Sequence, residues 1–448
     1  MSRAAVNAVD ASGRTVAFAT LGCRLNQVDT LDMQARLEAR GFRTVDFEEP
    51  ADVVVVNSCT VTGRADFSDR QMIRRAARRN PAARLVVTGC WAQTNPDAAA
   101  ATGVDLVVGN ADKPRIGELI EALVADDDHR PTRVAVGDIG AVRSLEAAPL
   151  PREPRRSRAF LKVQEGCQHR CAFCIVPLAR GVSRSLPPDV VLEQVRHLVG
   201  AGHQEVVLTG VDLGHYGADL TPRTTLAALV ERIATVSGLR WVRLSSVLPA
   251  YFTPNLIDVV TGSPVVAPHL HIPLQSGSDT VLRRMRRPYT VSMYRALVER
   301  LAGAIPGLGL GADVIVGFPG ETDADFAATQ ALVEALPFSY LHVFVYSDRK
   351  DTEAARLGDR VPAATAAARS ETLRSLARAK SLAFRTSMVG SAHEALVLET
   401  RDRATGHLVA LTGNYVDVLV DGADSLMRRV VKIGITAANG DRTSGELL

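Results

Sequence analysis

The stretch EGCQHRCAFCIVP, residues 165–177, carries three cysteines in a C-x3-C-x2-C spacing: Cys167, Cys171 and Cys174. The apolar run AFLKV, from Ala159, precedes it and predicts a β-strand, so the three thiols follow a strand on one short loop. Thiolates are ligands of zinc and of iron–sulfur clusters. A closed zinc site needs four ligands, and His169 inside the loop is a candidate for the fourth. Three thiolates on a four-iron cluster would instead leave one iron open, as a chemically active cluster requires.

The other three cysteines are dispersed, and each is the last residue of a predicted strand: Cys23, Cys59 and Cys90. These strands, TVAFATLGC, DVVVVNSC and RLVVTGC, alternate with predicted helices over residues 30–40 and 66–79, which is typical of a parallel sheet covered on both faces. Ligands of open α/β sheets bind at the carboxyl ends of strands, so we expect the three thiols to converge and to hold a shared metal cluster. The alternative is that each is a small buried hydrophobic residue, and three of three at strand ends argue against it.

Outward from the cysteine loop the βα rhythm continues, with six candidate strands that begin at Ala159, Glu205, Trp241, His269, Gly311 and Tyr340. Six strands with helical spacers fit a partial (β/α) barrel or a doubly wound sheet, and periodicity does not decide between them. A long helix rich in Ala and Arg is predicted from Ala364 to near Ser387. The short apolar runs after it predict a small antiparallel β-barrel.

The chain has 448 residues, of which 46% are hydrophobic and 23% charged, a globular composition that suggests roughly three domains. We expect a disordered tail (1–13), an N-terminal domain (14–148), a linker (149–158), a central domain (159–386) and a C-terminal domain (387–448). No apolar run reaches the roughly 18 residues of a membrane span, and the N-terminus lacks the apolar region of a signal peptide. We therefore expect a cytoplasmic protein without membrane contact or a disulfide framework.

The net charge of +3 neither requires nor excludes nucleic acid, so any basic patch must be local. Three arginine clusters are candidates for phosphate contacts: residues 64–84, with seven Arg against two Asp; the linker, with Arg152, Arg155, Arg156 and Arg158; and RRMRR, with Arg283, Arg284, Arg286 and Arg287. Most charge runs are solvated helix faces, so the clusters count only as a set. Tyr415 could stack on a base, but packing within the barrel is its favoured role.

The cysteine loop, with Phe173 before its last cysteine, resembles the radical S-adenosylmethionine superfamily. From Thr15 onward nearly the whole chain resembles the methylthiotransferases of that superfamily. The matching segments are TLGCRLNQ, NSCTVT, TGCWAQ, CIVPLARGVSRS, LTGVDLGHYG, RLSSVLP, HIPLQSGSDTVLRRMRRPYT, GADVIVGFPGET and GNYVDVLV. Members of this family act on isopentenyladenosine in tRNA, on threonylcarbamoyladenosine in tRNA, or on an aspartate of a ribosomal protein. TLGCRLNQ, NSCTVT, QEGC and IVPLARG are most similar to the threonylcarbamoyladenosine branch.

The resemblance implies a fold of three parts: an N-terminal parallel α/β sheet, a central partial (β/α)6 radical-SAM barrel and a C-terminal TRAM-like RNA-binding β-barrel. It implies a 4Fe-4S cluster on Cys167, Cys171 and Cys174 that binds S-adenosylmethionine and generates a 5′-deoxyadenosyl radical, which activates C2 of the modified adenosine. An auxiliary 4Fe-4S cluster on Cys23, Cys59 and Cys90 would deliver sulfur to C2, with a second S-adenosylmethionine supplying the methyl group. Five residues are implied near S-adenosylmethionine, with turn, cap or core packing roles as the alternative: Phe173, Gly210, Ser245, Gln275 and Asp313.

The implied partners are the anticodon loop of tRNA, modified at position 37, an electron donor such as flavodoxin or ferredoxin, and a sulfur donor, with the protein itself a monomer. The sequence departs from the family pattern at Val345, where Pro is usual, and at Asp351, where Gly is usual, which puts the local turn in doubt. A function from a different class, a non-catalytic iron–sulfur RNA-binding regulator, would bind RNA without cleaving S-adenosylmethionine.

Overall fold

The computed structural model describes residues 13–126, 131–149 and 156–448. The tail expected over 1–13, except for Gly13, and the linker arginines Arg152 and Arg155 lie outside these residues. The chain forms two units. Unit 1 combines Met1–Pro151 with two short segments of the cysteine-loop region, Gly166–His169 and Cys174–Val182. Unit 2 contains the remainder: Arg152–Glu165, Arg170–Phe173 and Ser183–Leu448. The domain boundaries drawn from the sequence stay a prediction.

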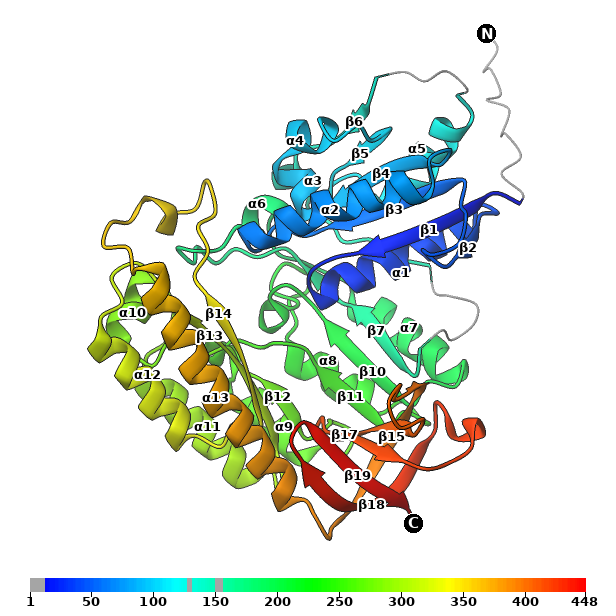
Figure 1. Ribbon diagram of the computed structural model, residues 1–448. Helices are drawn as coiled ribbons and strands as arrows, with labels where there is room; N and C mark the ends of the chain where they lie inside the picture. The colour runs from blue at the N-terminus through cyan, green and yellow to red at the C-terminus, as the bar shows by residue number, and fades with distance from the viewer. Residues whose placement is uncertain (1–12, 127–130, 150–155) are drawn as a thin grey trace. The chain divides into compact units, whose positions relative to one another are not determined.

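Unit 1 is built on a six-stranded sheet in the order β2-β1-β3-β4-β5-β6, in which all neighbours are parallel (Figure 1). Its strands are β1 (Thr15–Thr20), β2 (Arg43–Val45), β3 (Val53–Ser58), β4 (Arg84–Gly89), β5 (Leu106–Val108) and β6 (Arg133–Ala135). Its helices are α1 (Arg24–Glu38), α2 (Gly63–Arg79), α3 (Cys90–Thr94), α4 (Pro96–Ala100), α5 (Ile116–Val124) and α6 (Val176–Arg180), with short 3-10 turns at Lys113–Arg115 and Ile139–Ala141. The parallel sheet is confirmed, while the short edge strands β2 and β6 carry no continuous apolar run and were not predicted.

The order of this sheet reverses between β1 and β3. From β1 the chain passes to β2 on one side, and from β3 it continues to β4, β5 and β6 on the other. Such a reversal opens a crevice at the carboxyl ends of the two central strands, where open α/β sheets bind ligands. Cys23 and Cys59 follow these two strands in the chain.

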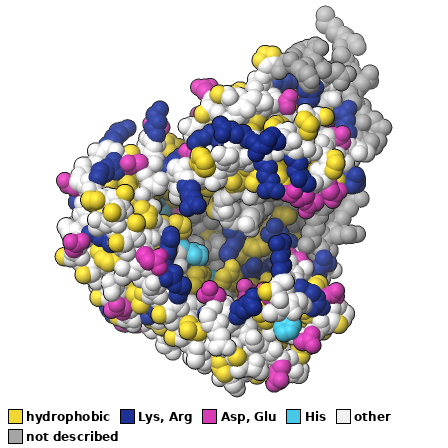
Figure 2. Space-filling view, viewed as in Figure 1, with side chains coloured by type: hydrophobic (Ala, Val, Ile, Leu, Met, Phe, Trp, Pro, Cys, Tyr) yellow, Lys and Arg dark blue, Asp and Glu magenta, His cyan; other side chains and the backbone are white. Residues whose placement is uncertain are grey.

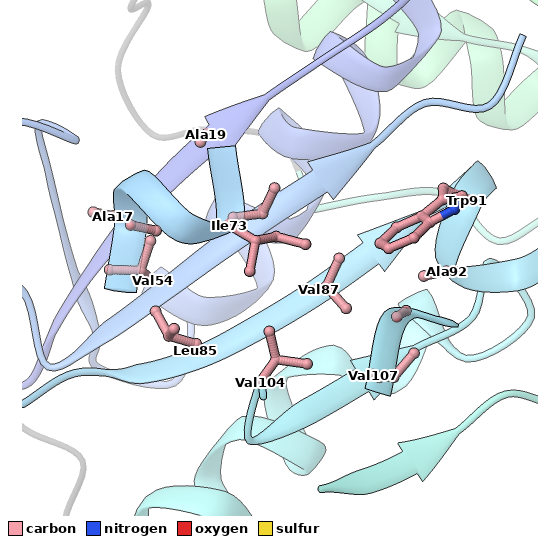
Figure 3. Packing of buried hydrophobic residues seen from close by; sticks show 13 residues of the cluster. Ala17, Ala19, Val54, Ile73, Leu85, Val87, Trp91, Ala92, Val104 and Val107 are labelled. Atoms are coloured by element: carbon pink, nitrogen blue, oxygen red, sulfur yellow. The ribbon is translucent and has the colours of Figure 1, made fainter. Parts of the chain in front are cut away.

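Helices cover both faces of the sheet. Alternate residues of each strand point to opposite faces, so each strand contributes side chains to both layers. On one face, Ile73 of α2 and Trp91 of α3 pack with Val54 and Val87 (Figure 3). On the other face, α1 and α5 pack against alternating residues such as Val55. Burial on both faces explains why these strands are continuous apolar runs rather than alternating ones.

Unit 2 begins with two parallel three-stranded arcs, β7-β10-β11 and β12-β13-β14. The strands are β7 (Arg158–Lys162), β10 (Glu205–Thr209), β11 (Trp241–Leu244), β12 (His269–His271), β13 (Gly309–Val316) and β14 (Tyr340–Val345), and a short hairpin pairs β8 (Gln164–Glu165) with β9 (Arg184–Ser185). The helices are α7 (Pro188–Gly200), α8 (Leu226–Ala234), α9 (Pro254–Gly262), α10 (Asp279–Arg284), α11 (Val291–Ala304) and α12 (Asp323–Ala335), with 3-10 turns at Leu213–His215, Pro249–Tyr251 and Ala354–Arg356. Within each arc the strands follow sequence order, which confirms the partial barrel over a doubly wound sheet.

The 25-residue α13 (Ala363–Ser387) leads into a closed barrel of five strands, β15-β16-β17-β19-β18. The strands are β15 (Ala392–Arg401), β16 (Leu408–Thr412), β17 (Asp417–Val420), β18 (Val430–Asn439) and β19 (Arg442–Leu447), with a 3-10 turn at Asp424–Leu426. The expected small barrel is present, with β17 and β19 as its one parallel pair. In the described segments, neither α13 nor any other helix has the length and apolar character to cross a bilayer.

A buried ion pair joins this small barrel to the partial barrel within unit 2. Arg243 and Glu205, both with side chains 0% exposed, form two hydrogen bonds of 2.8 and 3.0 Å, and Arg243 also donates to Gly413 O at 2.9 Å. The ring of Tyr415 stacks on His269 with centroids 4.4 Å apart and lies beside the Arg243 guanidinium. Tyr415 lies in the turn between β16 and β17 and packs against the partial barrel, which corrects the expectation that it packs within the small barrel.

The substitution Arg243→Leu should lower the free energy of unfolding by about 3–5 kcal/mol, because it leaves the Glu205 carboxylate buried without its partner. Urea denaturation measures the change. The control Arg232→Leu removes an exposed pair with Asp189, whose side chains are 45% and 88% exposed, and it should cost at most about 1 kcal/mol. Equal effects of the two substitutions would contradict a structural role for the buried pair.

Candidate functional site

The three N-terminal cysteines lie on loops that follow neighbouring strands of unit 1. Cys23 is the residue before α1, Cys59 follows β3 directly, and Cys90 is the first residue of α3, immediately after β4. None is the last residue of its strand, which corrects the expectation from the sequence. Gly22, two residues after β1, and Gly89, the last residue of β4, turn the chain before Cys23 and Cys90 with left-handed φ angles of +93° and +102°.

The same two glycines bring the loops together around Cys59. A Cβ atom on Gly22 would lie 2.6 Å from the Sγ of Cys59, and one on Gly89 would lie 2.3 Å from the backbone oxygen of Ser58. Both glycines directly precede a cysteine in the sequence. The loops of Cys23 and Cys90 therefore close on the Cys59 loop, as the convergence argument predicts.

Two polar side chains to which the sequence assigns no role fix these loops. The Nδ2 of Asn26 donates to the backbone oxygens of Leu21 and Ser58, both at 2.8 Å. The carboxylate of Asp69 accepts the backbone N–H of Cys59 at 3.1 and 3.2 Å, and burial raises the pKa of Asp69 to about 8. Asn26 stands inside TLGCRLNQ, and Asp69 counts in the sequence only as one of two acids on a basic helix. Their burial, which identifies their role, is not visible in the sequence.

The electrostatics of the three thiols favour a cationic ligand. Burial raises the pKa of Cys59 to about 12, and the nearby thiols of Cys90 and Cys23 contribute to this rise. A cation bound by the sulfurs would offset this effect, because a metal stabilises the thiolate form of a coordinating cysteine. A single tetrahedral zinc ion would bring its sulfur ligands within about 3.8 Å of one another. Among the described residues no set of three ligand atoms within 4.8 Å includes a cysteine.

The second cysteine loop also depends on a glycine. Gly166 has φ +75°, and a Cβ there would lie 1.9 Å from the backbone oxygen of Val182. Cys167 donates its N–H to Gly181 O at 3.0 Å, and the backbone N–H of His169 donates to Cys167 Sγ at 3.4 Å. In the part of the chain that the structure describes, no metal-ligand set includes the His169 side chain.

Arg287 contacts the cysteine loop within unit 2 and corrects one expectation. Its Nη1 donates to Cys171 Sγ at 3.1 Å, and its Nε donates to Tyr289 Oη at 3.1 Å. The cluster RRMRR was expected to offer its arginines to phosphate, but Arg287 is directed at a thiol. Arg284 is half-buried and donates to Gly320 O, which leaves Arg283 and Arg286 as the exposed members.

Unit 2 contains all five residues that were expected near S-adenosylmethionine. Ser245 Oγ and Gln275 Oε1 are buried atoms with no hydrogen-bond partner among the described residues, which is costly unless a ligand supplies one. Gly210 lies so close to Gln164 that a Cβ would come within 2.7 Å of its Oε1. Phe173 packs edge-on against Phe318, and the carboxylate of Asp313 accepts hydrogen bonds from two histidines. The two orphaned atoms fit a polar cofactor, and the five contacts themselves stay a prediction.

The helix α6, which follows the second cysteine loop, is hydrogen-bonded to α1, the helix that follows Cys23. Arg180, in α6, donates to Asn26 Oδ1 at 2.6 Å and pairs with Asp29 Oδ2 at 3.0 Å. Lys113 pairs with the same oxygen of Asp29 at 2.7 Å. Asn110, after β5, donates to the backbone oxygen of Ala179 at 2.7 Å. Asp29 lies in α1, which begins directly after Cys23, so both cysteine loops lead into helices that contact each other.

Basic side chains gather over α2 on the face shown in Figure 2. Arg75 and Arg79 share Glu48 as an ion-pair partner, while Arg64, Arg74 and Arg78 are exposed. This part of the 64–84 cluster is a solvated surface with an excess of positive charge, the property that attracts phosphate groups.

The comparisons with known proteins agree with this geometry. Residues 15–109 match the family described as "Uncharacterized protein family UPF0004", and residues 161–333 match the Radical SAM superfamily. The chain is 39% identical to the threonylcarbamoyladenosine tRNA methylthiotransferase of Bacillus subtilis, over 97% of this chain and 96% of that one. The identity to the same enzyme of Aquifex aeolicus is 38%, covering 91% and 97%. It is 35% to the tRNA-2-methylthio-N(6)-dimethylallyladenosine synthase of Moorella thermoacetica, covering 97% and 98%.

Among solved structures, the radical S-adenosylmethionine methyltransferase TsrM of Kitasatospora setae, with cobalamin and a [4Fe-4S] cluster bound, is similar with a TM-score of 0.58. The match covers 76% of this chain and 77% of that one at 17% identity, which supports the fold.

The substitution Gly22→Ala should remove the iron held by the first cysteine set after anaerobic reconstitution, because the new Cβ would occupy the space of the Cys59 side chain. The matched control is Gly103→Ala. Gly103 also has a left-handed φ, +80°, but no atom lies within 4 Å of the place that its Cβ would take, so this change should cost only the backbone strain of about 1–2 kcal/mol. Iron and sulfide analysis measures the result, and equal iron content in the two variants would contradict the convergence of the loops.

Proposed function

Because this chain belongs to the radical S-adenosylmethionine tRNA methylthiotransferase family, we propose that it transfers a methylthio group to C2 of N6-threonylcarbamoyladenosine at position 37 of tRNA. The protein is a transferase that uses S-adenosylmethionine and 4Fe-4S clusters. The observation that carries the proposal is the presence of two complete cysteine sets, one converging on Cys59 and one on the loop after β8. Relatives of the threonylcarbamoyladenosine branch supply the substrate.

Each cysteine set has its own role in this proposal. Cys167, Cys171 and Cys174 hold the cluster that binds S-adenosylmethionine, and Cys23, Cys59 and Cys90 hold the auxiliary cluster. When bound, these groups supply one-electron cleavage of S-adenosylmethionine and the sulfur atom that is transferred. The protein positions them: Arg287 orients Cys171, and Asn26 and Asp69 fix the loops around Cys59.

The five residues expected near S-adenosylmethionine are assigned to its binding. Ser245 Oγ and Gln275 Oε1, which have no partner among the described residues, provide hydrogen bonds, and Gly210 allows Gln164 to pack against the backbone at the end of β10. Phe173 offers an aromatic face, and Asp313 lies beside Gln275, whose backbone N–H donates to the backbone oxygen of Asp313 at 2.8 Å.

The tRNA is assigned to two surfaces. The exposed arginines of α2 attract the phosphate backbone, and the C-terminal barrel presents exposed basic residues at Arg403, Arg428, Arg429 and Lys432. An external electron donor of the flavodoxin or ferredoxin type and a sulfur donor complete the reaction, which we place in the cytoplasm.

Two cysteine substitutions separate the roles of the clusters in the purified, anaerobically reconstituted enzyme with threonylcarbamoylated tRNA. Cys171→Ala should abolish 5′-deoxyadenosine formation, because the cluster that cleaves S-adenosylmethionine loses a ligand. Cys59→Ala should keep part of that activity but form no methylthio product. Chromatography with mass spectrometry measures both products.

Sulfur insertion by Cys59→Ala would overturn the role of the first cysteine set. A wild-type enzyme that binds tRNA but forms no deoxyadenosine would favour the regulator instead. Methylthiolation of dimethylallyladenosine or of a ribosomal protein in place of threonylcarbamoyladenosine would keep the chemistry and change the substrate.

A further inference from the structure

Three side chains on neighbouring strands of unit 2 form a cluster, and the proposed function assigns a role to Asp313 but none to its two histidines. His271, at the end of β12, places Nε2 3.2 Å from Asp313 Oδ1. His342, on β14, places Nδ1 3.2 Å from the same oxygen. Asp313 and His342 are register partners on β13 and β14. The three ligand-type atoms all lie within 4.8 Å of one another.

The two histidines differ in whether a ring nitrogen remains available for a further hydrogen bond. Both ring nitrogens of His271 are engaged, since Nδ1 lies 3.0 Å from Tyr340 Oη, and its side chain is 9% exposed. The side chain of His342 is 56% exposed, and its Nε2 has no hydrogen-bond partner among the described residues. Burial alone would raise the pKa of Asp313, but the hydrogen bonds and charges of the two histidines outweigh it and hold this pKa below its ordinary value. An ionised carboxylate thus orients the His342 ring and leaves Nε2 directed away from it.

The cluster adjoins the residues assigned to cofactor binding. Gln275 donates its backbone N–H to the backbone oxygen of Asp313 at 2.8 Å, so its orphaned Oε1 belongs to the same region. Phe173 of the cysteine loop packs on Phe318, which packs on Tyr346 with centroids 5.3 Å apart.

From Tyr346 the chain leads back into β14, which carries Phe344 and His342. Side chains alternate in a β-strand, so Phe344 and His342 of β14 share one side. Tyr346 follows the end of β14 and stays next to β13, because its N–H donates to Val316 O at 2.8 Å. Phe344 is 45% exposed and meets the His342 ring at 6.4 Å. An exposed aromatic and an exposed imidazole therefore extend from the cysteine loop along an open face of β14.

We propose that His342, oriented by Asp313, is a specificity-determining residue that hydrogen-bonds the polar amino-acid substituent on N6 of the substrate adenosine, with Phe344 packing beside it. The inference rests on the proposed function, because it takes C2 of that adenosine to react near the cysteine loop. The N6 substituent then extends from the adenine away from C2. His342 is separated from Phe173 of the cysteine loop in the same way, so it can meet the substituent.

The chemistry distinguishes the two kinds of tRNA substrate in the family. A threonylcarbamoyl group carries a carboxylate, a hydroxyl and amide N–H groups, so it offers a partner to Nε2 whether the ring is neutral or protonated. A dimethylallyl group offers none and would bury the polar Nε2 against hydrocarbon. A site built to hydrogen-bond its substrate rejects an analogue that lacks the polar group.

A divalent metal ion is the competing occupant of this cluster, since two histidines and a carboxylate are common metal ligands. Here the same Asp313 oxygen contacts both rings, and the other nitrogen of His271 contacts Tyr340. A metal would have to replace both contacts to Asp313, whereas a substrate would need only the free Nε2. The geometry therefore favours the substrate, and the metal becomes an outcome of the test.

The test compares His342→Phe, His342→Gln and wild-type holoenzyme on tRNA carrying threonylcarbamoyladenosine and on tRNA carrying dimethylallyladenosine. His342→Phe keeps an aromatic ring but removes the hydrogen bond, and it should lower kcat/KM for the threonylcarbamoyl substrate roughly ten- to a hundredfold. The loss should lie mainly in KM and should not extend to the dimethylallyl substrate. His342→Gln keeps a donor and an acceptor and should restore part of the loss. The exposed His197 of α7 supplies the control, His197→Ala, which should change neither substrate.

Two further measurements distinguish a failure of the inference about His342 from a failure of the proposed function. Iron content and deoxyadenosine formation should stay at wild-type levels in His342→Phe. Binding of free N6-threonylcarbamoyladenosine to the holoenzyme, with N6-dimethylallyladenosine as the comparison, should weaken in His342→Phe and tests the inference even if turnover fails.

An equal loss on both substrates, or no loss, would overturn the role of His342 while leaving the proposed function intact. A stoichiometric metal other than cluster iron, present in the wild type and lost in His342→Phe, would overturn it in favour of a metal site. A wild-type enzyme that methylthiolates no tRNA would instead overturn the proposed function.

Discussion

The buried ion pair between Arg180 and Asp29 is the constraint on which the candidate site depends. Both side chains are almost fully buried, at 2% and 1% exposed, and Lys113 and Asn26 complete their hydrogen bonds. Breaking one partner of such a pair costs about 3–5 kcal/mol, yet a hydrophobic replacement of the whole pair is often neutral. Its value here is positional, because it joins the helix that follows Cys174 to the helix that follows Cys23.

Through this ion pair, α6 after the second cysteine loop contacts α1 of the N-terminal sheet, although the two helices are far apart in sequence. The reversal of strand order between β1 and β3 opens the edge of the sheet where Cys23 and Cys59 emerge. Gly22 and Gly89 allow the loops of Cys23 and Cys90 to approach the Cys59 loop closely, which supports the proposal that the three thiols share one cluster. Positioning is the main contribution that a protein makes to cofactor chemistry of this kind, since the cofactors themselves carry the reactive steps.

Periodicity and cysteine spacing predicted most of the fold and the general location of the site, because buried parallel strands leave long apolar runs that are local in sequence. The missing parts depend on pairings between distant residues. Asn26 has no local signal that distinguishes a loop clamp from an ordinary helix residue. Arg287 reads as one more arginine in a basic cluster until its contact with Cys171 is seen. Periodicity does not separate the partial barrel from a doubly wound sheet, since strand order is a property of tertiary pairing.

The central claim is that the two cysteine sets act together on threonylcarbamoyladenosine of tRNA. Mass spectrometry of nucleosides from total tRNA, in the host strain with and without this gene, tests it most directly. The account predicts that deletion removes 2-methylthio-N6-threonylcarbamoyladenosine and that the unthiolated precursor accumulates, with recovery on complementation by the wild-type gene. Unchanged levels of the methylthiolated nucleoside and its precursor in the deletion strain would contradict it.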